Sequence, residues 1–286
     1  MSEAFFNGWK DGLTELIRRA ATDLPGDVED AMRRALAHEE AGSRAAFMLD
    51  SLLQNVALAR QENLPMCQDT GTLTFWFDVP PGTDTVPLTG ATRAAVAAAT
   101  ERGWLRQNTI LEPAGKSAPD NLAEHHPVIY FRQQPRADVR VQLLLKGGGC
   151  ENVSHQYSLP DEDIGAGRNL EGVRRCIIDA VWRAQGRGCA PGILGVCVGG
   201  DRATGYALAK DQLLRPLGQP SPIAEYARLE EEVLAEVQNL GIGPMGMGGA
   251  STLLGIRIGT ASRLPASYFV TIAYMCWACR RATLTR

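Results

Sequence analysis

The chain has 286 residues, of which 45% are hydrophobic, and its formal net charge is −3. This is enough apolar material for one large domain or two small ones. The charges are mixed in sign without a basic stripe, which argues against a nucleic-acid partner, and no apolar run approaches the ~20 residues of a membrane helix. The sequence does not open with a basic segment followed by an apolar one. We therefore expect a cytoplasmic protein whose cysteines are reduced.

The N-terminal part is predicted to be helical. Apolar residues recur at helical spacing over residues 8–60, with one break at Pro25-Gly26 and a second near Ala41-Gly42. A strand rich in β-branched and aromatic residues follows at 72–80.

The later segments alternate between helical and strand patterns. In chain order they are a helix at 91–104, a polar loop at 107–127, strands at 126–133 and 137–149, a helix at 170–188, a strand at 193–200, helices at 203–217 and 221–243, a strand at 251–261, and a strand or helix at 267–281. Ser221 is the predicted N-cap of its helix, with Pro222 at the first position and Gly241 past its end. The pattern predicts an α+β fold: a helical N-terminal part and a largely antiparallel sheet flanked by helices, in a single domain.

Glycine is concentrated in loops at the ends of these elements. The loops lie at 67–72, 146–152, 188–192 with 199–205, and 241–249. Glycine lets a backbone approach a ligand closely, although each loop taken alone is also compatible with a tight turn. The run GIGPMG at 241–246 has the spacing GxGxxG, but it follows a helix and not a strand, so it does not predict a dinucleotide site.

Three of the seven cysteines lie in or next to loops and far apart in the sequence: Cys67, Cys189 and Cys276. With only four histidines, a histidine-rich metal site is not indicated. Thiolates from three loops are suited to an iron–sulfur cluster, while the alternative is that the cysteines are small buried hydrophobes. The second interpretation is favoured for Cys176, in a helix, and Cys197, in a strand.

Seven segments in a fixed order resemble one known family. The segments are CQDTGT, LRQNTI, KGGGCEN, GCAPGILG, GGDRATGYALAK, GIGPMGMGG and YMCWACRR, over residues 67–281. Together they resemble the α-type catalytic domain of the class I, iron–sulfur fumarate hydratases and the related L(+)-tartrate dehydratases. The resemblance covers nearly the whole chain and implies one catalytic domain over residues 1–286.

The resemblance also implies a cofactor. Cys67, Cys189 and Cys276 match the three cysteines that hold a 4Fe–4S cluster in the family. The fourth iron is then left without a protein ligand and can act as a Lewis acid on a small dicarboxylate.

The same motifs imply the substrate-binding residues. By resemblance, Gln68 and Asp69 contact the substrate and are the catalytic candidates, and Arg106 binds a carboxylate with its planar fork. The run that contains Gly148 and Gly149 offers backbone N–H groups to the other carboxylate, and Lys146 adds positive charge.

The implied reaction is the reversible hydration of fumarate to L-malate, a step of the tricarboxylic acid cycle. In the family a smaller β-type domain or subunit completes the active site and supplies the threonine thought to act as base. No such domain is visible here, so we expect a chain that needs a β-type partner, and a homodimer of α-type chains. Leu264 stands where the family often has a histidine, so the function of that histidine is absent or supplied elsewhere.

Other interpretations remain open. The substrate is tartrate if the chain is the α subunit of an L(+)-tartrate dehydratase. A scaffolding or regulatory subunit that lost its cluster predicts neither iron nor sulfide. A zinc module predicts zinc at the same three cysteines together with Cys150 or Cys279.

Overall fold

The computed structural model describes residues 3–286, and the chain divides into two compact units. The first unit takes in Gln54–Gly148, Arg280–Arg286 and the chain up to Pro25, and the second takes in Gly26–Leu53 and Gly149–Cys279. The helix α3 (Arg44–Glu62) contains one of the boundaries. Each unit has its own sheet and its own apolar core.

The sheet of the first unit has four strands in the order β10-β5-β1-β4. The strands are β1 (Thr72–Val79), β4 (Val128–Gln133), β5 (Arg140–Lys146) and β10 (Arg280–Thr285). The central strand β1 is parallel to β4 and antiparallel to β5, and β10 is antiparallel to β5. A two-stranded ribbon of β2 (Ile110–Leu111) and β3 (Lys116–Ser117) accompanies this sheet.

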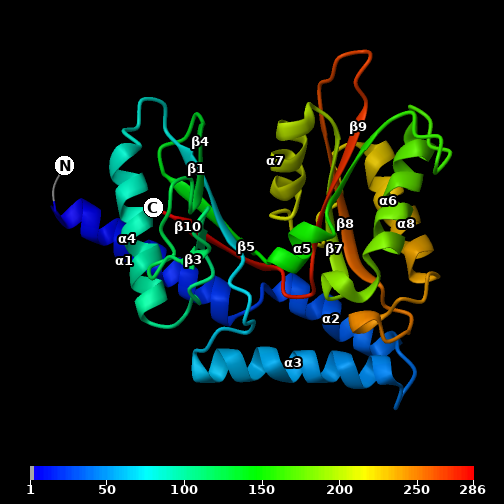
Figure 1. Cartoon of the computed structure of the whole chain (residues 1–286), viewed down its shortest axis with the longest axis horizontal. Coiled ribbons are helices and arrows are strands. Elements are labelled where there is room, and N and C mark those ends of the chain that lie inside the picture. The colour runs from blue at the N-terminus through cyan, green and yellow to red at the C-terminus, as the bar shows by residue number, and fades with distance from the viewer. Residues whose placement is uncertain (1–2) are drawn as a thin grey trace. The chain divides into compact units, whose positions relative to one another are not determined.

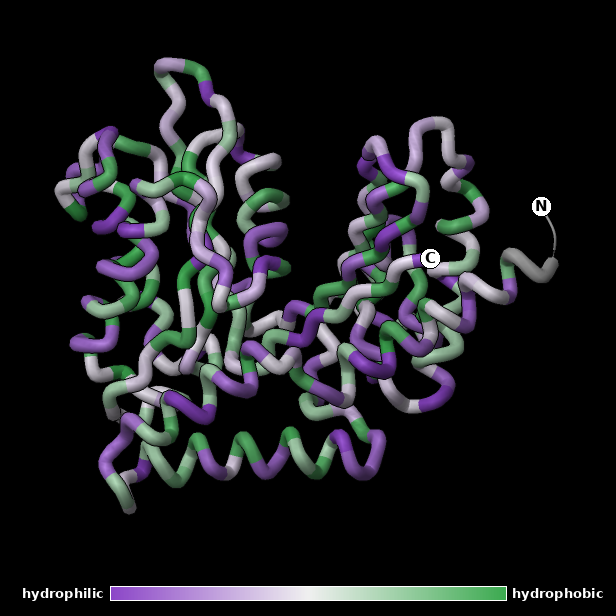
Figure 2. The backbone as a smooth tube through the Cα atoms, turned by 180° about the vertical axis from the view of Figure 1, so that it is seen from behind, coloured by the Kyte–Doolittle hydropathy of each residue, from purple (hydrophilic) through white to green (hydrophobic). Residues whose placement is uncertain are grey.

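One face of this sheet forms the core of the first unit. Side chains alternate between the two faces of a strand, so Leu73, Phe75 and Phe77 of β1 point to one face. They are buried with residues of the helices α1 (Glu3–Thr22) and α4 (Val86–Glu101). Figure 2 shows hydrophobic and hydrophilic residues alternating along the helices, as expected of helices with one buried face.

The strand register places three chain segments at one end of this sheet. Thr72, the first residue of β1, pairs with Lys146, the last residue of β5. Arg280, the first residue of β10, pairs with Leu145. The loop before β1, the glycine run after β5 and the segment entering β10 therefore meet at the same end.

The sheet of the second unit has the order β6-β9-β7-β8. Its strands are β6 (His155–Ser158), β7 (Gly192–Gly199), β8 (Leu253–Ala261) and β9 (Phe269–Met275). The strand β7 is parallel to β8 and antiparallel to β9, which also pairs with β6 in antiparallel fashion. Two short 3-10 turns, η1 (Gln185–Gly188) and η2 (Pro244–Gly246), lie in the loops.

Helices cover both faces of the second sheet (Figure 1). The helices α6 (Leu170–Ala184) and α8 (Ala224–Gln238) bury their apolar residues against one face. The helix α7 (Arg202–Gln212) packs against the other, where Gly195 permits close approach because a Cβ there would lie 2.1 Å from the Ala209 carbonyl oxygen. The unit also contains α2 (Gly26–His38) and the short α5 (Gly148–Asn152), whose first residue belongs to the first unit.

The predicted α+β class is confirmed, as is the helical N-terminal part with its break at Gly42, which has a positive φ of 78°. Strands form where the last segment was ambiguous. The predicted antiparallel sheet is two sheets, and each also contains one parallel pair. No helix among residues 3–286 is long and apolar enough to cross a membrane.

The predicted N-cap Ser221 is wrong. The helix α8 begins at Ala224 with Ile223 as its N-cap. The Ser221 hydroxyl instead donates to the Ile258 carbonyl, and its backbone N–H donates to the buried Glu230. Tertiary contacts to β8 and α8 have overridden the local capping signal.

Candidate functional site

The carboxylate of Asp69 is held by two backbone N–H groups. Gly71 donates to Oδ1 at 2.9 Å and Gly148 donates to Oδ2 at 2.7 Å. A Cβ on Gly71 would lie 2.4 Å from the Lys146 carbonyl, and a Cβ on Gly147 would lie 2.8 Å from Oδ2. The glycines on both sides are therefore needed for this close approach, which fixes the orientation of the carboxylate.

Arg106 lies beside the same loop. Its Nη1 donates to the Gln68 carbonyl at 3.2 Å, and its backbone N–H donates to the Thr70 hydroxyl at 2.7 Å. The side chain is exposed, and no carboxylate among the side chains described, those of residues 6–286, forms an ion pair with it. The structure thus brings Gln68, Asp69 and Arg106 together, with the guanidinium open to an anion.

Asn121, in the loop predicted at 107–127, positions this arginine. The residue is fully buried and has a positive φ of 58°. Its amide donates to the Arg106 carbonyl at 2.7 Å and to the Thr100 hydroxyl at 3.0 Å, while Oδ1 accepts from the backbone N–H groups of Asn108 and Thr109. Only a side chain with both donors and an acceptor can make this set of bonds.

Lys146 and the glycine run follow at the end of β5. The Lys146 side chain is 1% exposed, so its ammonium belongs to the interior of the unit. Gly148 and Gly149 are exposed. Because the Gly148 N–H donates to Asp69, that group is engaged within the protein, and a role for it toward a substrate remains a prediction.

Cys189 and Cys276 come together in the second unit. Cys189 ends η1 with a positive φ of 53°, and its carbonyl accepts from the Trp277 N–H at 3.3 Å. This bond joins the loop before β7 to the loop after β9. Cys279 follows Cys276 with the spacing Cys-x-x-Cys, so a further buried thiol lies close in sequence to the predicted ligand.

The buried side chain of Tyr274 lies beneath the loop that carries Cys189. A Cβ on Gly188 or on Gly192 would lie 2.3 or 2.4 Å from the ring of Tyr274, so both glycines pack directly on it. Burial raises the pKa of Tyr274, and the nearby thiols of Cys150 and Cys276 raise it further. The phenol is therefore a neutral, rigid support for the cysteine loops.

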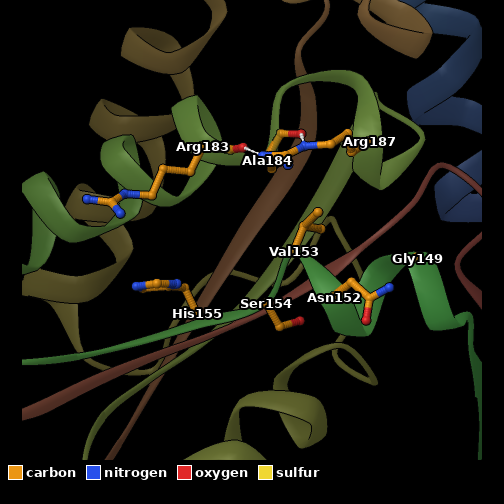
Figure 3. Close-up of a pocket in the computed structure, with 8 residues that line it drawn as sticks. All are labelled: Gly149, Asn152, Val153, Ser154, His155, Arg183, Ala184 and Arg187. Carbon is orange, nitrogen blue, oxygen red and sulfur yellow. Dashed lines mark hydrogen bonds between the residues drawn. The ribbon is translucent and has the colours of Figure 1, made fainter.

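A cavity of about 400 Å³ adjoins these loops in the second unit (Figure 3). Gly149 lines it together with His155, Arg183 and Arg187. Arg183 is paired with Asp179 at 2.5 Å, whereas Arg187 donates to backbone carbonyl groups. Burial, and then the charge of Arg183, lower the pKa of His155. Gly149 thus faces a cavity of basic character.

Two of the remaining cysteines, Cys176 and Cys197, lie in the apolar interior. Cys176 and Cys197 are 0% and 1% exposed, and burial raises their thiol pKa values to about 12 and about 11. This confirms the prediction that they are buried hydrophobes. Of the predicted ligands, Cys67 and Cys189 are partly exposed, whereas Cys276 is buried.

The donor set fits an iron–sulfur cluster chemically. Three reduced cysteines in glycine-rich loops provide the thiolates that such clusters need. Cys67 belongs to the first unit and the other two to the second. Among the side chains that the structure describes, no group of three His, Cys, Asp or Glu residues is arranged to hold a metal ion.

This α+β chain, with its glycine-fixed aspartate and paired cysteine loops, matches a family model over residues 10–285. The model is that of the fumarate hydratase (fumerase) family, and the chain belongs to this family.

Individual relatives agree with this assignment. The chain is 45% identical over 274 residues to a Geobacillus stearothermophilus protein provisionally named fumarate hydratase class I. It is 31% identical over 277 residues to a Methanocaldococcus jannaschii protein provisionally named L(+)-tartrate dehydratase subunit alpha, and 28% identical over 293 residues to the L(+)-tartrate dehydratase subunit alpha of Escherichia coli K12.

The relatives differ in length. The matched part of this chain spans 53% of the Geobacillus protein but 95% and 94% of the two subunits named alpha. The sequence therefore corresponds to about half of one relative and to nearly all of the others.

Proposed function

We propose that the chain is the α-type part of a hydro-lyase that catalyses the reversible hydration of fumarate to L-malate. Membership of the fumarate hydratase family and the 45% identity to a relative named for this class support the proposal. The observation that carries it is the Asp69 carboxylate, fixed by two backbone N–H groups beside the open guanidinium of Arg106.

The proposed cofactor is a 4Fe–4S cluster held by Cys67, Cys189 and Cys276. When bound, it would supply a Lewis-acidic iron that polarises the hydroxyl oxygen which leaves malate or adds to fumarate. The carbonyl of Cys189, bonded to the Trp277 N–H, supports the mutual placement of two of the three ligand loops.

The residues of this chain bind and orient the substrate. Arg106 presents a planar fork to one carboxylate, which suits bidentate binding. Gln68 donates its amide N–H to a substrate oxygen, and Asp69 accepts from the substrate hydroxyl. Lys146 contributes positive charge from the interior, and Gly149 offers a backbone N–H at the cavity of basic character.

Proton transfer completes the balance of the reaction. Dehydration of malate removes hydroxide from one carbon and a proton from the next, and the electron pair left behind is delocalised into the adjacent carboxylate. By resemblance, the base that takes this proton is a threonine of a β-type domain or subunit. We propose such a partner, a homodimer of α-type chains and a cytoplasmic location.

The test uses the full chain purified without oxygen. We expect about four irons and four sulfides per chain, and hydratase activity once a β-type partner is added. The variant Cys189→Ser should lose the iron, while the matched control Cys197→Ala, a buried thiol outside the site, should keep it. Equal iron content in both variants would contradict the ligand assignment.

L(+)-tartrate is the second candidate substrate. The observation in its favour is that relatives named tartrate dehydratase subunit alpha match along nearly their whole length. One experiment distinguishes the fumarate hypothesis from the tartrate hypothesis: the enzyme complemented with a β-type partner should turn over one of the two dicarboxylates with a clearly higher kcat/KM.

A further inference from the structure

Arg280 is a buried cation at the start of β10. Its side chain is 2% exposed, and it is among the largest fully buried side chains. Within the described part of the chain its Nε has no hydrogen-bond partner, and no carboxylate forms an ion pair with it. A buried charge left unpaired is strongly unfavourable, so this guanidinium needs an anion that the protein side chains do not provide.

The register of α1 along β10 locates Arg280 within the first unit. Arg286, at the far end of β10, donates to the Gly8 carbonyl, and Arg19 donates to the Thr283 carbonyl at 2.8 Å. The helix and the strand therefore run in opposite directions, so the C-terminal end of α1 lies toward Arg280. At that end, the Met66 N–H donates to the Ala21 carbonyl.

Met66, which is hydrogen-bonded to Ala21, directly precedes Cys67 in the sequence. Met66 is itself buried, and the loop from Cys67 to Gly71 enters β1 at the sheet end where Arg280 begins β10. Arg280 and the Cys67 segment thus share one end of the first unit.

Two acids in the segments that lead to this end of the sheet are already bonded within the protein. Asp69 accepts from Gly71 and Gly148, and Asp23 is paired with Arg60 at 2.7 Å. A dicarboxylate that enters from solvent meets the exposed Arg106, whereas Arg280 is enclosed. The anion must therefore be a group that becomes part of the interior when it binds.

We propose that Arg280 is a positioning residue for the cofactor: its guanidinium compensates the negative charge of the thiolate-held cluster at Cys67. This inference rests on the cluster of the proposed function. In this proposal Arg280 helps to retain the cluster and raises its midpoint potential, and it has no part in substrate binding.

The first test compares Arg280→Met with the wild type in two states. In the cluster-free chain, the variant should unfold at the same or a higher denaturant concentration, because an unpaired buried charge has been removed. In the cluster-loaded chain prepared without oxygen, the variant should lose its fourth iron faster, on the order of tenfold, when it is mildly oxidised. The three-iron EPR signal measures this loss.

The second test is the midpoint potential of the cluster. Removal of a nearby positive charge disfavours the more negative, reduced state, so Arg280→Met should shift the potential to more negative values. Arg280→Lys, which keeps the charge, should restore most of the shift. Arg140→Gln is the control, because it removes the same charge at the opposite end of the sheet, where Arg140 lies opposite Asp78 and Thr285 in the strand register. This variant should leave the midpoint potential unchanged.

The outcomes separate this inference from the proposed function. A wild-type chain that cannot be loaded with iron and sulfide overturns the cluster itself. A loaded wild type, together with an Arg280→Met variant that matches it in iron loss and potential, overturns the role of Arg280 alone. A strongly destabilised cluster-free variant would also contradict it, because that result means Arg280 is paired within the protein.

Discussion

The Oδ2 atom of Asp69 accepts a hydrogen bond of 2.7 Å from the backbone N–H of Gly148, 79 residues further along the chain. This bond connects the loop before β1 to the first residue of α5. A carboxylate fixed in this way needs little reorientation when it binds a substrate, and this preorganisation is expected of a catalytic group.

Replacement of this carboxylate should abolish most of the activity. In Asp69→Asn, one carboxylate oxygen becomes an NH₂ group, which cannot accept from a backbone N–H or from a substrate hydroxyl. We expect kcat of the complemented enzyme to fall by about 10²–10⁴-fold. Asp84→Asn is the matched control, because Asp84 accepts from the Val86 N–H in an exposed loop. A similar loss in both variants would contradict a specific role for Asp69.

The orientation of the same carboxylate can be tested without changing its charge. In Gly147→Ala the new Cβ would lie 2.8 Å from Oδ2, so the carboxylate has to rotate. We expect at least a roughly tenfold loss in kcat with iron content preserved. Gly218→Ala is the control, since nothing lies within 4 Å of its added Cβ. Unchanged kinetics of Gly147→Ala would show that the carboxylate orientation is unimportant.

Asn121 should act on the site through Arg106. Asn121→Ala removes four hydrogen bonds and leaves backbone groups unpaired, so we expect the free energy of unfolding to fall by about 3 kcal/mol and KM to rise. Asn121→Gly retains the conformational freedom that a φ of 58° favours. Equal stability losses by urea unfolding in the two variants would assign the effect to the side chain, and a much smaller loss in Asn121→Gly would assign it to the backbone.

Stability should decline in mild acid because of His126. Burial, and then the charge of Arg93, lower the pKa of this imidazole, and its Nε2 is buried without a hydrogen-bond partner in the described structure. The unfolded chain therefore binds more protons below the ordinary value of 6.5, and stability present above that pH is lost as pH falls through and below it. His126→Phe should reduce this loss between pH 8 and pH 5.5, measured by urea unfolding. The exposed His38→Gln should not.

The local elements were largely predictable, because periodicity and breaking residues act over a few positions. The break at Gly42 and the strand over 72–79 are examples. The pairing of strands was not predictable, since alternation in β1 says nothing about whether β4 lies parallel to it. The short α5 and β6 were missed because runs of four or five residues carry too little pattern.

In the candidate site, too, local features were predictable and long-range ones were not. The sequence motif predicted roles for Gln68 and Asp69, and the structure places Arg106 beside them through a hydrogen bond to the Gln68 carbonyl. The roles of these residues stay predictions. Asn121 was missed because an asparagine in a polar loop has the appearance of any turn residue, and only the fold reveals its burial. The cost of enclosing Arg280 is likewise invisible in a sequence, where an arginine at a strand start is ordinary.

The strand β10 has a consequence for the order of folding. It is the last strand along the chain, yet it pairs with β5 in the first unit, and the intervening second unit spans Gly149–Cys279. During synthesis, one edge of β5 therefore stays unpaired until the whole second unit has emerged. The same late step delivers Arg280 and, just before it, Cys276. The last predicted ligand, Cys276, therefore emerges only a few residues before the strand that completes the first sheet, so the full ligand set and the complete sheet become available at nearly the same point of synthesis.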